Sequence, residues 1–216
     1  MPLESGSLTD ALTEALRKQV LEGRLEPGTK ITEHWAAAEF EVARSTAKAA
    51  IDRLVREGLL RGGVHKSAVV PRLTAEDVTD LYFSREPIER LAVRHLAERS
   101  EVPKAAERHL TLMQAAVAAD DAVEHAVNDI ALHRELVAAT GSRRLRRMHD
   151  LIIAEAQLCI AQVRRSSSVE LATLTEQHTA ILAAIRSGDP QGAAAALVAD
   201  LHSCRETLLR DLARAT

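Results

Sequence analysis

Apolar residues repeat at helical spacing along almost the whole chain, and one short stretch interrupts them. Residues 8 to about 21 place their apolar side chains on one stripe behind Ser7, a residue suited to cap a helix. From Thr74 onward an apolar side chain returns every three or four positions. Between residues 59 and 70 the pattern changes to short runs with glycines and β-branched residues, which are typical of strands. The pattern predicts a mostly α-helical protein in two parts, the first of which carries a small β-hairpin.

The stretch that leads into this interruption, residues 31–63, predicts two short amphipathic helices around a tight turn. In the second helix one face is apolar and the other is polar. The apolar positions are Ala47, Ala50, Ile51, Leu54 and Val55, and the polar ones are Arg44, Ser45, Lys48 and Arg56. Gly58 follows as a C-terminal cap, and residues 59–63 then predict a strand that enters a turn, with residues 64–70 as the return strand. This order predicts a helix-turn-helix with a wing.

A helix-turn-helix places the N-terminal end of its second helix in the DNA major groove. Arg and Lys there can bind guanine edges or phosphates, and Ser and Thr hydroxyls can contact either. The candidate DNA-binding residues of the helix and the wing are Arg44, Ser45, Thr46, Lys48, Arg53, Arg61, Gly62 and Gly63. The pattern alone also fits a small helix pair with a polar outer face and no DNA partner.

The second part begins at Thr74, which is followed by an acidic turn and therefore predicts a capped helix. We expect this helix to extend at least to Leu96, with Pro87 kinking or splitting it. Further helices are predicted from Pro103 and over residues 121–139, 142–163, 169–186 and 190–214. Together they predict an antiparallel all-α bundle of six or seven helices, with one domain at residues 1–72 and a second at residues 73–216.

Composition narrows the possible partners. Aromatic residues make up only 2% of the chain, so stacking platforms for single-stranded nucleic acid are scarce. The net charge is −3, but residues 43–72 hold seven basic and two acidic residues, so positive charge collects on the second helix and the wing. No stretch has the features of a signal peptide or a membrane span, and Cys159 and Cys204 lack the spacing of a disulfide framework or metal motif. We therefore expect a cytoplasmic protein with no membrane partner.

Four residues of the predicted bundle form a candidate metal site. Asp129 and His133 are four residues apart, so both project from one face of the same helix. His178 and His202 each lie among apolar residues of a later helix, where we expect them to point inward. One Asp and three His suit a divalent transition metal of the Zn, Ni or Mn class. A His on an apolar stripe is more often a hydrogen-bonded core residue, and the spacing alone leaves that interpretation open.

The helix-turn-helix stretch resembles the N-terminal winged-helix domain of the GntR family of bacterial transcription regulators. The shared residues are Pro27, Gly28, Ile31, Glu33, Val42, Arg44, Ala50, Ile51, Glu57, Gly58, Leu59, Gly62 and Gly63. The resemblance implies a winged helix that binds DNA. Ala43, Ser45, Thr46, Lys48 and Ala49 depart from the family pattern, so the family's base preferences do not carry over. Ala43 also lacks the usual capping oxygen, and we expect the recognition helix to start at Ser45 or to begin less stably.

Residues 74–214 resemble the ligand-binding FCD domain that follows the winged helix in the FadR-type branch of this family. Many members bind a metal through an Asp-x-x-x-His pair and two later histidines, positions that Asp129, His133, His178 and His202 match. Arg85 matches the family's early Arg-x-x-x-Glu motif, whose Arg often faces the effector. The resemblance thus implies four metal ligands and an effector-binding arginine. Octahedral coordination would leave two neighbouring positions open for a carboxylate, whereas tetrahedral zinc would leave none.

The two resemblances imply a homodimeric transcription repressor that binds double-stranded operator DNA and is not an enzyme. A small carboxylate effector bound at the metal is expected to modulate its operator affinity. Two alternatives stay open at this point. One is a regulator that responds to the metal itself, and the other is a metal-dependent enzyme that uses the Asp and the three His residues.

Overall fold

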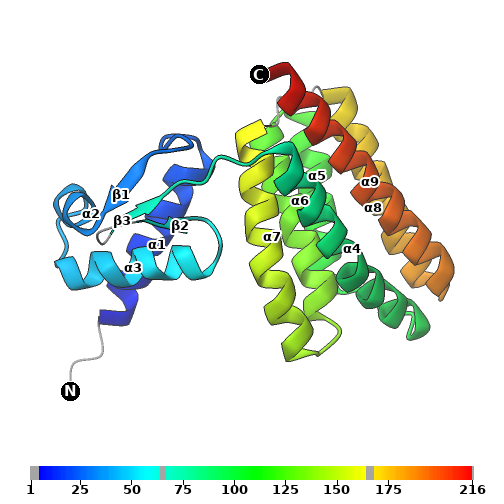
Figure 1. Cartoon of the computed structure of the whole chain (residues 1–216). Helices are drawn as coiled ribbons and strands as arrows, with labels where there is room; N and C mark the ends of the chain where they lie inside the picture. Colours follow the sequence, from blue (N-terminus) through cyan, green and yellow to red (C-terminus); the bar gives the residue numbers. More distant parts are fainter. Residues whose placement is uncertain (1–4, 64–66, 164–167, 216) are drawn as a thin grey trace. The chain divides into compact units, whose positions relative to one another are not determined.

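The computed structural model describes residues 5–63, 67–163 and 168–215, and within these ranges it contains nine helices and three short strands (Figure 1). The chain divides into two compact units, Met1–Leu73 and Thr74–Thr216. The described strands all belong to the first unit, and every described element of the second is a helix. None of these helices contains a stretch both long and apolar enough to cross a membrane. The predicted fold class, a winged helix-turn-helix followed by an all-α bundle, is confirmed.

The N-terminal unit combines three helices with a three-stranded antiparallel sheet. In chain order its elements are α1 (Ser5–Leu21), β1 (Lys30–Thr32), α2 (Glu33–Glu39), α3 (Arg44–Arg56), β2 (Arg61–Gly62) and β3 (Ser67–Val69). The strand order is β1-β3-β2, so Ala68 of the central strand lies between Ile31 and Gly62. Leu16, Ile31 and Leu54 are fully buried, which places the core of this unit between α1, β1 and α3.

Several N-terminal elements differ from the sequence prediction. α1 begins at Ser5, so Ser7 lies inside the helix rather than at its cap. β1 has three residues, too few to show an alternating pattern, and the sequence analysis missed it. α3 begins at Arg44 although Ala43 supplies no side-chain cap. Of the predicted return strand, residues 64–66 lie outside the described residues, and β3 covers Ser67–Val69.

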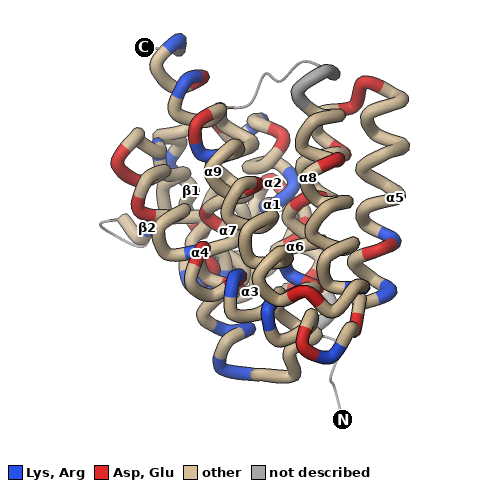
Figure 2. The backbone as a smooth tube through the Cα atoms, turned by 90° about the vertical axis from the view of Figure 1, so that its right-hand side faces the viewer, with Lys and Arg blue, Asp and Glu red and all other residues tan. Residues whose placement is uncertain are grey.

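The C-terminal unit is a bundle of six described helices, the smaller of the two predicted numbers. They are α4 (Ala75–Glu98), α5 (Lys104–Ala118), α6 (Ala122–Ala138), α7 (Arg143–Val163), α8 (Ser168–Arg186) and α9 (Pro190–Ala215). α4 packs against α9 and α7, α5 packs against α6, and α8 packs against α9. Figure 2 shows α9, α8 and α5 across one side of the bundle. α4 also contacts α6 and α8, so side chains from four helices can meet in the interior.

Side-chain caps fix the starts of three bundle helices. Thr74 Oγ1 accepts a hydrogen bond from the Asp77 backbone N–H at 3.2 Å, and Asp77 Oδ2 accepts one from the Thr74 backbone N–H at 2.8 Å. Asp121 caps α6 and Asp189 caps α9, each through a carboxylate oxygen that accepts from backbone N–H groups of the first turn. These three starts lie where the sequence predicts them.

Pro87 lies inside α4, which runs unbroken from Ala75 to Glu98. Of the two effects predicted for Pro87, a kink or a split, the split does not occur. A proline inside a helix costs about 3 kcal/mol because it removes a backbone hydrogen bond and its ring crowds the preceding turn. α4 buries ten residues, and each large apolar side chain among them stabilises the packed helix by about 1.5–3 kcal/mol. Packing of the buried side thus outweighs the local penalty.

Candidate metal centre

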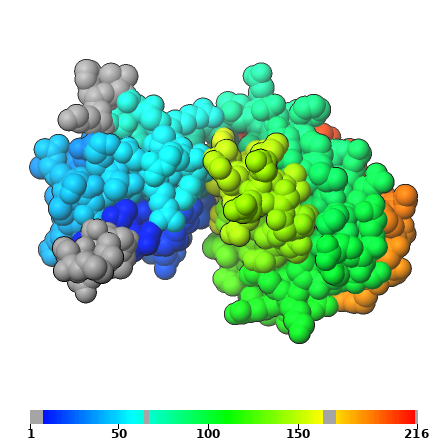
Figure 3. All heavy atoms as spheres, turned by 90° about the horizontal axis from the view of Figure 1, so that it is seen from below, coloured from blue at the N-terminus to red at the C-terminus, as the bar shows by residue number. Residues whose placement is uncertain are grey.

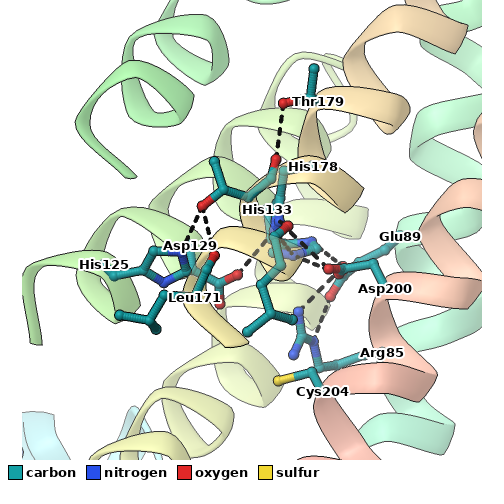
Figure 4. Close-up of polar contacts among 12 residues, drawn as sticks. Arg85, Glu89, His125, Asp129, His133, Leu171, His178, Thr179, Asp200 and Cys204 are labelled. Atoms are coloured by element: carbon teal, nitrogen blue, oxygen red, sulfur yellow. Dashed lines mark hydrogen bonds and ion pairs between the residues drawn. The ribbon is translucent and has the colours of Figure 1, made fainter. Parts of the chain in front are cut away.

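The structure brings three of the four predicted metal ligands together inside the bundle (Figure 4). Asp129 and His133 project from α6, and His178 projects from α8. All three residues are buried, and one potential ligand atom from each lies within 4.8 Å of the others. Ile130 and Leu136 of α6 are buried as well, so this side of the helix faces the interior. Helical spacing and apolar neighbours together therefore position the cluster.

The donor atoms are spaced like ligands around one cation. His178 Nε2 lies 2.9 Å from Asp129 Oδ1 and 3.1 Å from His133 Nε2. Neighbouring ligands held at about 2.1 Å from a metal lie about 3 Å apart when they subtend a right angle. Two imidazole nitrogens that face each other need a proton or a cation between them, because both would otherwise present lone pairs. The cluster therefore fits a divalent transition-metal ion.

An oxygen atom lies close to the outer nitrogen of each histidine. His178 Nδ1 donates to the backbone carbonyl oxygen of Leu174 at 2.7 Å. His133 Nδ1 lies 2.6 Å from Oε2 of Glu89. When the outer nitrogen, Nδ1, carries the proton, the lone pair of Nε2 can point toward the other donor atoms. Metal-binding histidines usually have an acceptor next to the outer nitrogen. The surroundings thus orient both rings with Nε2 toward the centre of the cluster.

Glu89 of α4 links this cluster to further buried charge. Its carboxylate lies 2.6 Å from His133 Nδ1 and 3.0 Å from His149 Nε2, and it also pairs with Arg85. Burial acts to raise the pKa of Glu89, but the charges of Arg85 and His133 outweigh burial and hold it well below its usual value. Glu89 therefore remains a carboxylate with three partners in the interior of the bundle.

Arg85, the predicted effector-binding residue, lies beside the cluster with its guanidinium directed at Glu89. The Nε and Nη2 atoms of Arg85 lie 2.7 and 3.5 Å from the two Glu89 oxygens. The guanidinium carbon also lies 4.9 Å from the centre of the Tyr82 ring. Burial acts against the charged form, but Glu89 outweighs it and raises the pKa of Arg85. Arg85 is thus a permanent buried cation next to the candidate ligands.

The carboxylates around the two histidines strengthen their hold on protons. Burial opposes the charged form of His133, but Glu89 and Asp200 outweigh it and raise the pKa of His133 to about 10. Burial likewise acts to lower the pKa of His178, but Asp200 and Asp129 make the net shift upward. A proton on His133 and a metal cation compete for the same negatively charged site. Metal binding at neutral pH must therefore displace a proton.

The structure does not bring His202, the predicted fourth ligand, to the cluster. Its side chain is 52% exposed, and its Nε2 lies 3.6 Å from Glu86 Oε2. The buried stripe of α9 runs through Ala193, Leu197, Leu201, Cys204 and Leu208. His202 is one residue beyond Leu201, and one step along a helix turns a side chain by about 100°. His202 therefore faces outward, which corrects the sequence prediction.

Asp200 is the residue of α9 that reaches the histidines. Its Oδ2 lies 3.4 Å from His133 Nε2, and its Oδ1 lies 3.5 Å from His178 Nδ1. That nitrogen already donates to Leu174, and Asp200 Oδ1 is buried with no hydrogen-bond donor among the described residues. A buried carboxylate oxygen without a donor is costly, and a cation would satisfy it. Asp200 therefore lies beside the cluster of Asp129, His133 and His178, and its carboxylate is the candidate for a fourth donor.

Sequence reasoning missed Glu89, His149 and Asp200 as members of this network. Asp200 carries a usable signal, because it follows Leu197 by three residues and precedes Cys204 by four, on the buried stripe of α9. Glu89 is the acidic end of the same Arg-x-x-x-Glu motif that contains Arg85. His149 follows a run of exposed arginines, and no local pattern distinguishes it.

Most of the predicted DNA-binding residues lie on the exposed side of α3 or at the wing. The exposed ones are Arg44, Ser45, Lys48, Arg61, Gly62 and Gly63, and Thr46 is half-buried. Arg44 lies 3.8 Å from Glu33, and Lys48 pairs with Asp52. More than half of each basic side chain nevertheless remains exposed to solvent. The first turns of α3 therefore present charge and hydroxyl groups on one surface.

Arg53 differs from the other predicted DNA-binding residues, because its guanidinium joins α3 to α1. Its Nε lies 3.0 Å from Glu57 Oε1, and its guanidinium also pairs with Asp10 of α1. Glu57 in turn binds Arg17 of α1. Burial acts to raise the pKa of Glu57, but the hydrogen bonds and charges of Arg17 and Arg53 make the net shift downward. The structure thus assigns Arg53 to the packing of α3 on α1.

Both parts of the chain match families of known proteins. The curated relatives include two proteins of Bacillus subtilis, the HTH-type transcriptional regulator YdhC and the gluconate operon transcriptional repressor. YdhC is 32% identical over 99 residues, which cover 46% of this chain and 42% of that protein. The gluconate operon repressor is 29% identical over 126 residues, which cover 57% of this chain and 51% of that protein. The chain therefore spans about half the length of these relatives.

A solved structure and two family models complete the comparison. A structure described as a GntR transcriptional regulator from Rhodococcus sp. RHA1 has a TM-score of 0.82 and 22% identity, and the match covers 94% of this chain and 98% of that one. At this identity the likeness shows the fold. Residues 8–70 match the model for bacterial regulatory proteins of the gntR family, and residues 80–203 match the FCD domain. The chain belongs to the GntR family of bacterial regulatory proteins, in the branch whose C-terminal part is an FCD domain.

Proposed function

We propose that this protein is a transcription repressor that binds a two-fold operator as a homodimer, and that a small carboxylate bound at a metal site modulates its operator affinity. The observation that carries the proposal is the buried cluster of Asp129, His133 and His178, with Asp200 beside it, in a chain that also exposes a recognition helix. Membership of the GntR family supports the DNA-binding part. The gluconate operon repressor among its relatives supports the repressor part.

The DNA contacts are assigned to the first turns of α3 and to the wing. Arg44 and Lys48 can bind base edges or phosphates, and the hydroxyls of Ser45 and Thr46 can bind either. Gly62 and Gly63 have no side chains and allow a close approach to the DNA backbone, and Arg61 beside them can bind a phosphate. Each winged helix carries a modest positive charge, so tight binding requires two of them on half-sites about 34–36 Å apart or at multiples of that spacing.

The proposed metal ligands are Asp129, His133 and His178, with Asp200 as the fourth in place of His202. Two imidazoles and two carboxylates suit a divalent metal of the Mn, Ni or Zn class. When bound, such a cation supplies a Lewis acid for a carboxylate oxygen. The residues of the chain hold the two Nε2 atoms inward, keep the site dry and direct the outer N–H of His133 to Glu89.

Arg85 is the proposed second contact for the effector. Glu89 engages Arg85 through Nε and Nη2, and a guanidinium has five N–H donors, so donors remain for a carboxylate. A divalent cation bound by two aspartates has no net charge, and Glu89 balances Arg85, so an acid would be held by open metal positions and by the remaining N–H donors of Arg85. Small sugar acids and dicarboxylates are the first candidates, because the metal and Arg85 can each bind one acidic or hydroxyl oxygen.

The test is an operator-binding titration on the full chain. Operator fragments are selected from random DNA with the metal-loaded protein, and affinity is measured with and without gluconate, other sugar acids and dicarboxylates. A tenfold change in operator affinity corresponds to about 1.4 kcal/mol of coupling, and linkage requires the operator to change acid affinity by the same factor. An acid that binds equally well with and without operator contradicts the proposed regulation.

A second candidate function is a repressor that responds to the metal itself. The observation in its favour is that Glu89 and Tyr82 already occupy the guanidinium of Arg85. In this case removal of the metal by a chelator changes operator affinity, and no small acid changes it further. Operator titrations in chelator, in metal and in metal with acid therefore distinguish the two functions.

A further inference from the structure

Both basic residues on the first turns of the recognition helix α3 have acidic partners. Arg44 lies 3.8 Å from Glu33, and Lys48 pairs with Asp52. The hydrogen bond and the charge of Asp52 raise the pKa of Lys48. In Figure 3 the cyan part of the chain, which contains α3, lies at the surface of the N-terminal unit. The surface assigned to DNA therefore carries carboxylates beside its cations.

Asp52 lies on the side of α3 that faces DNA. It follows Lys48 by four residues, so the two side chains lie on one face of the helix. Together with Glu33, Gly62 and Gly63 they line a groove of about 220 Å³ between α3 and the wing. DNA that contacts both α3 and the wing passes over this groove. The carboxylate of Asp52 therefore lies close to the bound DNA.

Helix stability does not explain the pair of Lys48 and Asp52. An ion pair on a helix is more stabilising when the acid precedes the base, because the acid then lies toward the positive end of the helix dipole. In α3 the order is reversed, since the lysine comes first. Both side chains are about half exposed, and exposed pairs contribute little to folding. A role in DNA binding explains an acid at this position better.

We propose that Asp52 is a specificity-determining residue that directs Lys48 toward a base edge in the major groove and away from the phosphates. The ammonium group of Lys48 has three N–H donors, so one can bind Asp52 while another binds O6 or N7 of a guanine. Without Asp52 the flexible lysine side chain is free to bind a phosphate instead. The inference rests on the DNA contacts that the proposed function assigns to α3.

The charge of Asp52 also weakens binding to DNA that lacks the operator sequence. Phosphate contacts supply essentially all of the non-specific affinity and carry no sequence information. A carboxylate on this surface repels the phosphates of every sequence, whereas the contact of Lys48 with a guanine offsets that repulsion only on the operator. Asp52 thus raises the ratio of operator affinity to non-specific affinity, which decides occupancy among the many competing sites of a genome.

The test measures how tightly the full chain binds a selected operator fragment and a scrambled fragment of equal length, by fluorescence anisotropy at several salt concentrations. Asp52→Asn keeps the size of the side chain and removes its charge. It should raise affinity for the scrambled fragment about tenfold and lower the ratio of operator to scrambled affinity by about tenfold or more. The slope of log affinity against log salt for the scrambled fragment should steepen by about 0.9 per bound subunit, because Lys48 gains one phosphate.

Glu14→Gln is the matched control for the loss of one negative charge. Glu14 is exposed on α1 and pairs with Arg17, so its removal should change the affinity ratio and the salt slope little. Asp52→Glu keeps the charge and should retain most of the discrimination. Equal effects of Asp52→Asn and Glu14→Gln would overturn the proposal, because Asp52 would then act only through the net charge of the protein.

A double variant tests whether Asp52 acts through Lys48. In a Lys48→Gln background, Asp52→Asn should leave the affinity ratio and the salt slope almost unchanged, since no lysine remains to be directed. A slope that still steepens in this background contradicts the proposal. A Lys48→Gln variant that binds the operator as tightly as the wild type instead contradicts the contacts assigned to α3 in the proposed function. Circular dichroism verifies that all variants are folded.

Discussion

The recognition surface of α3 and the cluster inside the bundle both rely on charge, but they are built in opposite ways. Arg44 and Lys48 are largely exposed, and each can exchange its acidic partner for water. Glu89, His133 and Asp200 are buried and can exchange only with one another or with a bound cation. Exposed ion pairs contribute about 0–1 kcal/mol, whereas a buried charge that loses its partner costs several. Substitutions of Arg44 and Lys48 should therefore change binding alone, and substitutions in the cluster should change folding too.

The largest effect is expected for Glu89→Gln. This change leaves Arg85 as a buried cation without its counter-charge and should lower the free energy of unfolding by about 3–5 kcal/mol, as measured by urea denaturation. Glu86→Gln, three residues earlier on the same helix, removes a partly exposed carboxylate and is the matched control. Equal urea midpoints for the two variants would show that the buried pair does not stabilise the fold.

The next effect compares Asp200 with His202 as metal ligands. Asp200→Asn should weaken binding of Mn²⁺, Ni²⁺ or Zn²⁺ by about 100-fold, because it removes a ligand charge from the cluster, whereas His202→Ala should leave metal affinity unchanged. Isothermal titration of the chelator-treated protein measures both variants. The opposite order of effects would return His202 to the site and remove Asp200 from it.

A smaller effect is expected on the recognition surface. Arg44→Ala should weaken operator binding by about 10- to 100-fold and leave the urea midpoint almost unchanged, because the side chain is exposed. Arg53→Ala should do the reverse, since it breaks the contacts of α3 with Asp10 and Glu57. For both variants, fluorescence anisotropy measures operator affinity and urea denaturation measures stability. An Arg44→Ala variant with full operator affinity would exclude Arg44 from the interface.

The smallest effect, counted per pH unit, is expected for the pH dependence of metal affinity. Because the pKa of His133 is raised to about 10, metal affinity should rise about tenfold per pH unit between pH 7 and 9 as one proton is displaced. In the metal-free protein the sign is opposite. The raised pKa contributes stability that is complete below the ordinary value of about 6.5 and is lost as pH rises through about 10. Titrations at three pH values, and urea midpoints in chelator, measure both trends.

His133→Gln is the control for this prediction. It removes the titrating ring, so the loss of metal-free stability above neutral pH should shrink in the variant. A metal affinity of the wild-type protein that stays constant from pH 7 to 9 would contradict the raised pKa.

Helical periodicity predicted most of the fold because the bundle helices are long and carry strong end signals. Thr74 caps a helix as expected, and Asp121 and Asp189 cap the helices predicted to begin at residues 121 and 190. β1 escaped prediction because three residues give no period, and its strand exists only through pairing with β3. The sequence could not exclude a split at Pro87 for a related reason, since local sequence shows the proline penalty but not the packing that offsets it.

The candidate site was only partly predictable for a geometric reason. Asp129 and His133 share one helix, and their relative position follows from helical spacing. Whether Asp200 or His202 faces the cluster depends on the rotation of α9 about its axis. The apolar residues next to each of them do not define that rotation, and only the complete buried stripe of α9 does. Glu89 and His149 come from two different helices, α4 and α7, and their meeting depends on packing that no local pattern contains.

The contacts of Glu57 bear on how the DNA specificity of this protein can evolve. Glu57 joins Arg53, near the last turn of α3, to Arg17 of α1, so the recognition helix is fastened at the end away from Arg44. Stability and base recognition therefore depend on separate sets of residues within one helix. A library that randomises positions 44, 45, 46 and 48 while keeping this anchor should retain folded proteins in large numbers, and new operator sequences become accessible by selection without compensating changes elsewhere.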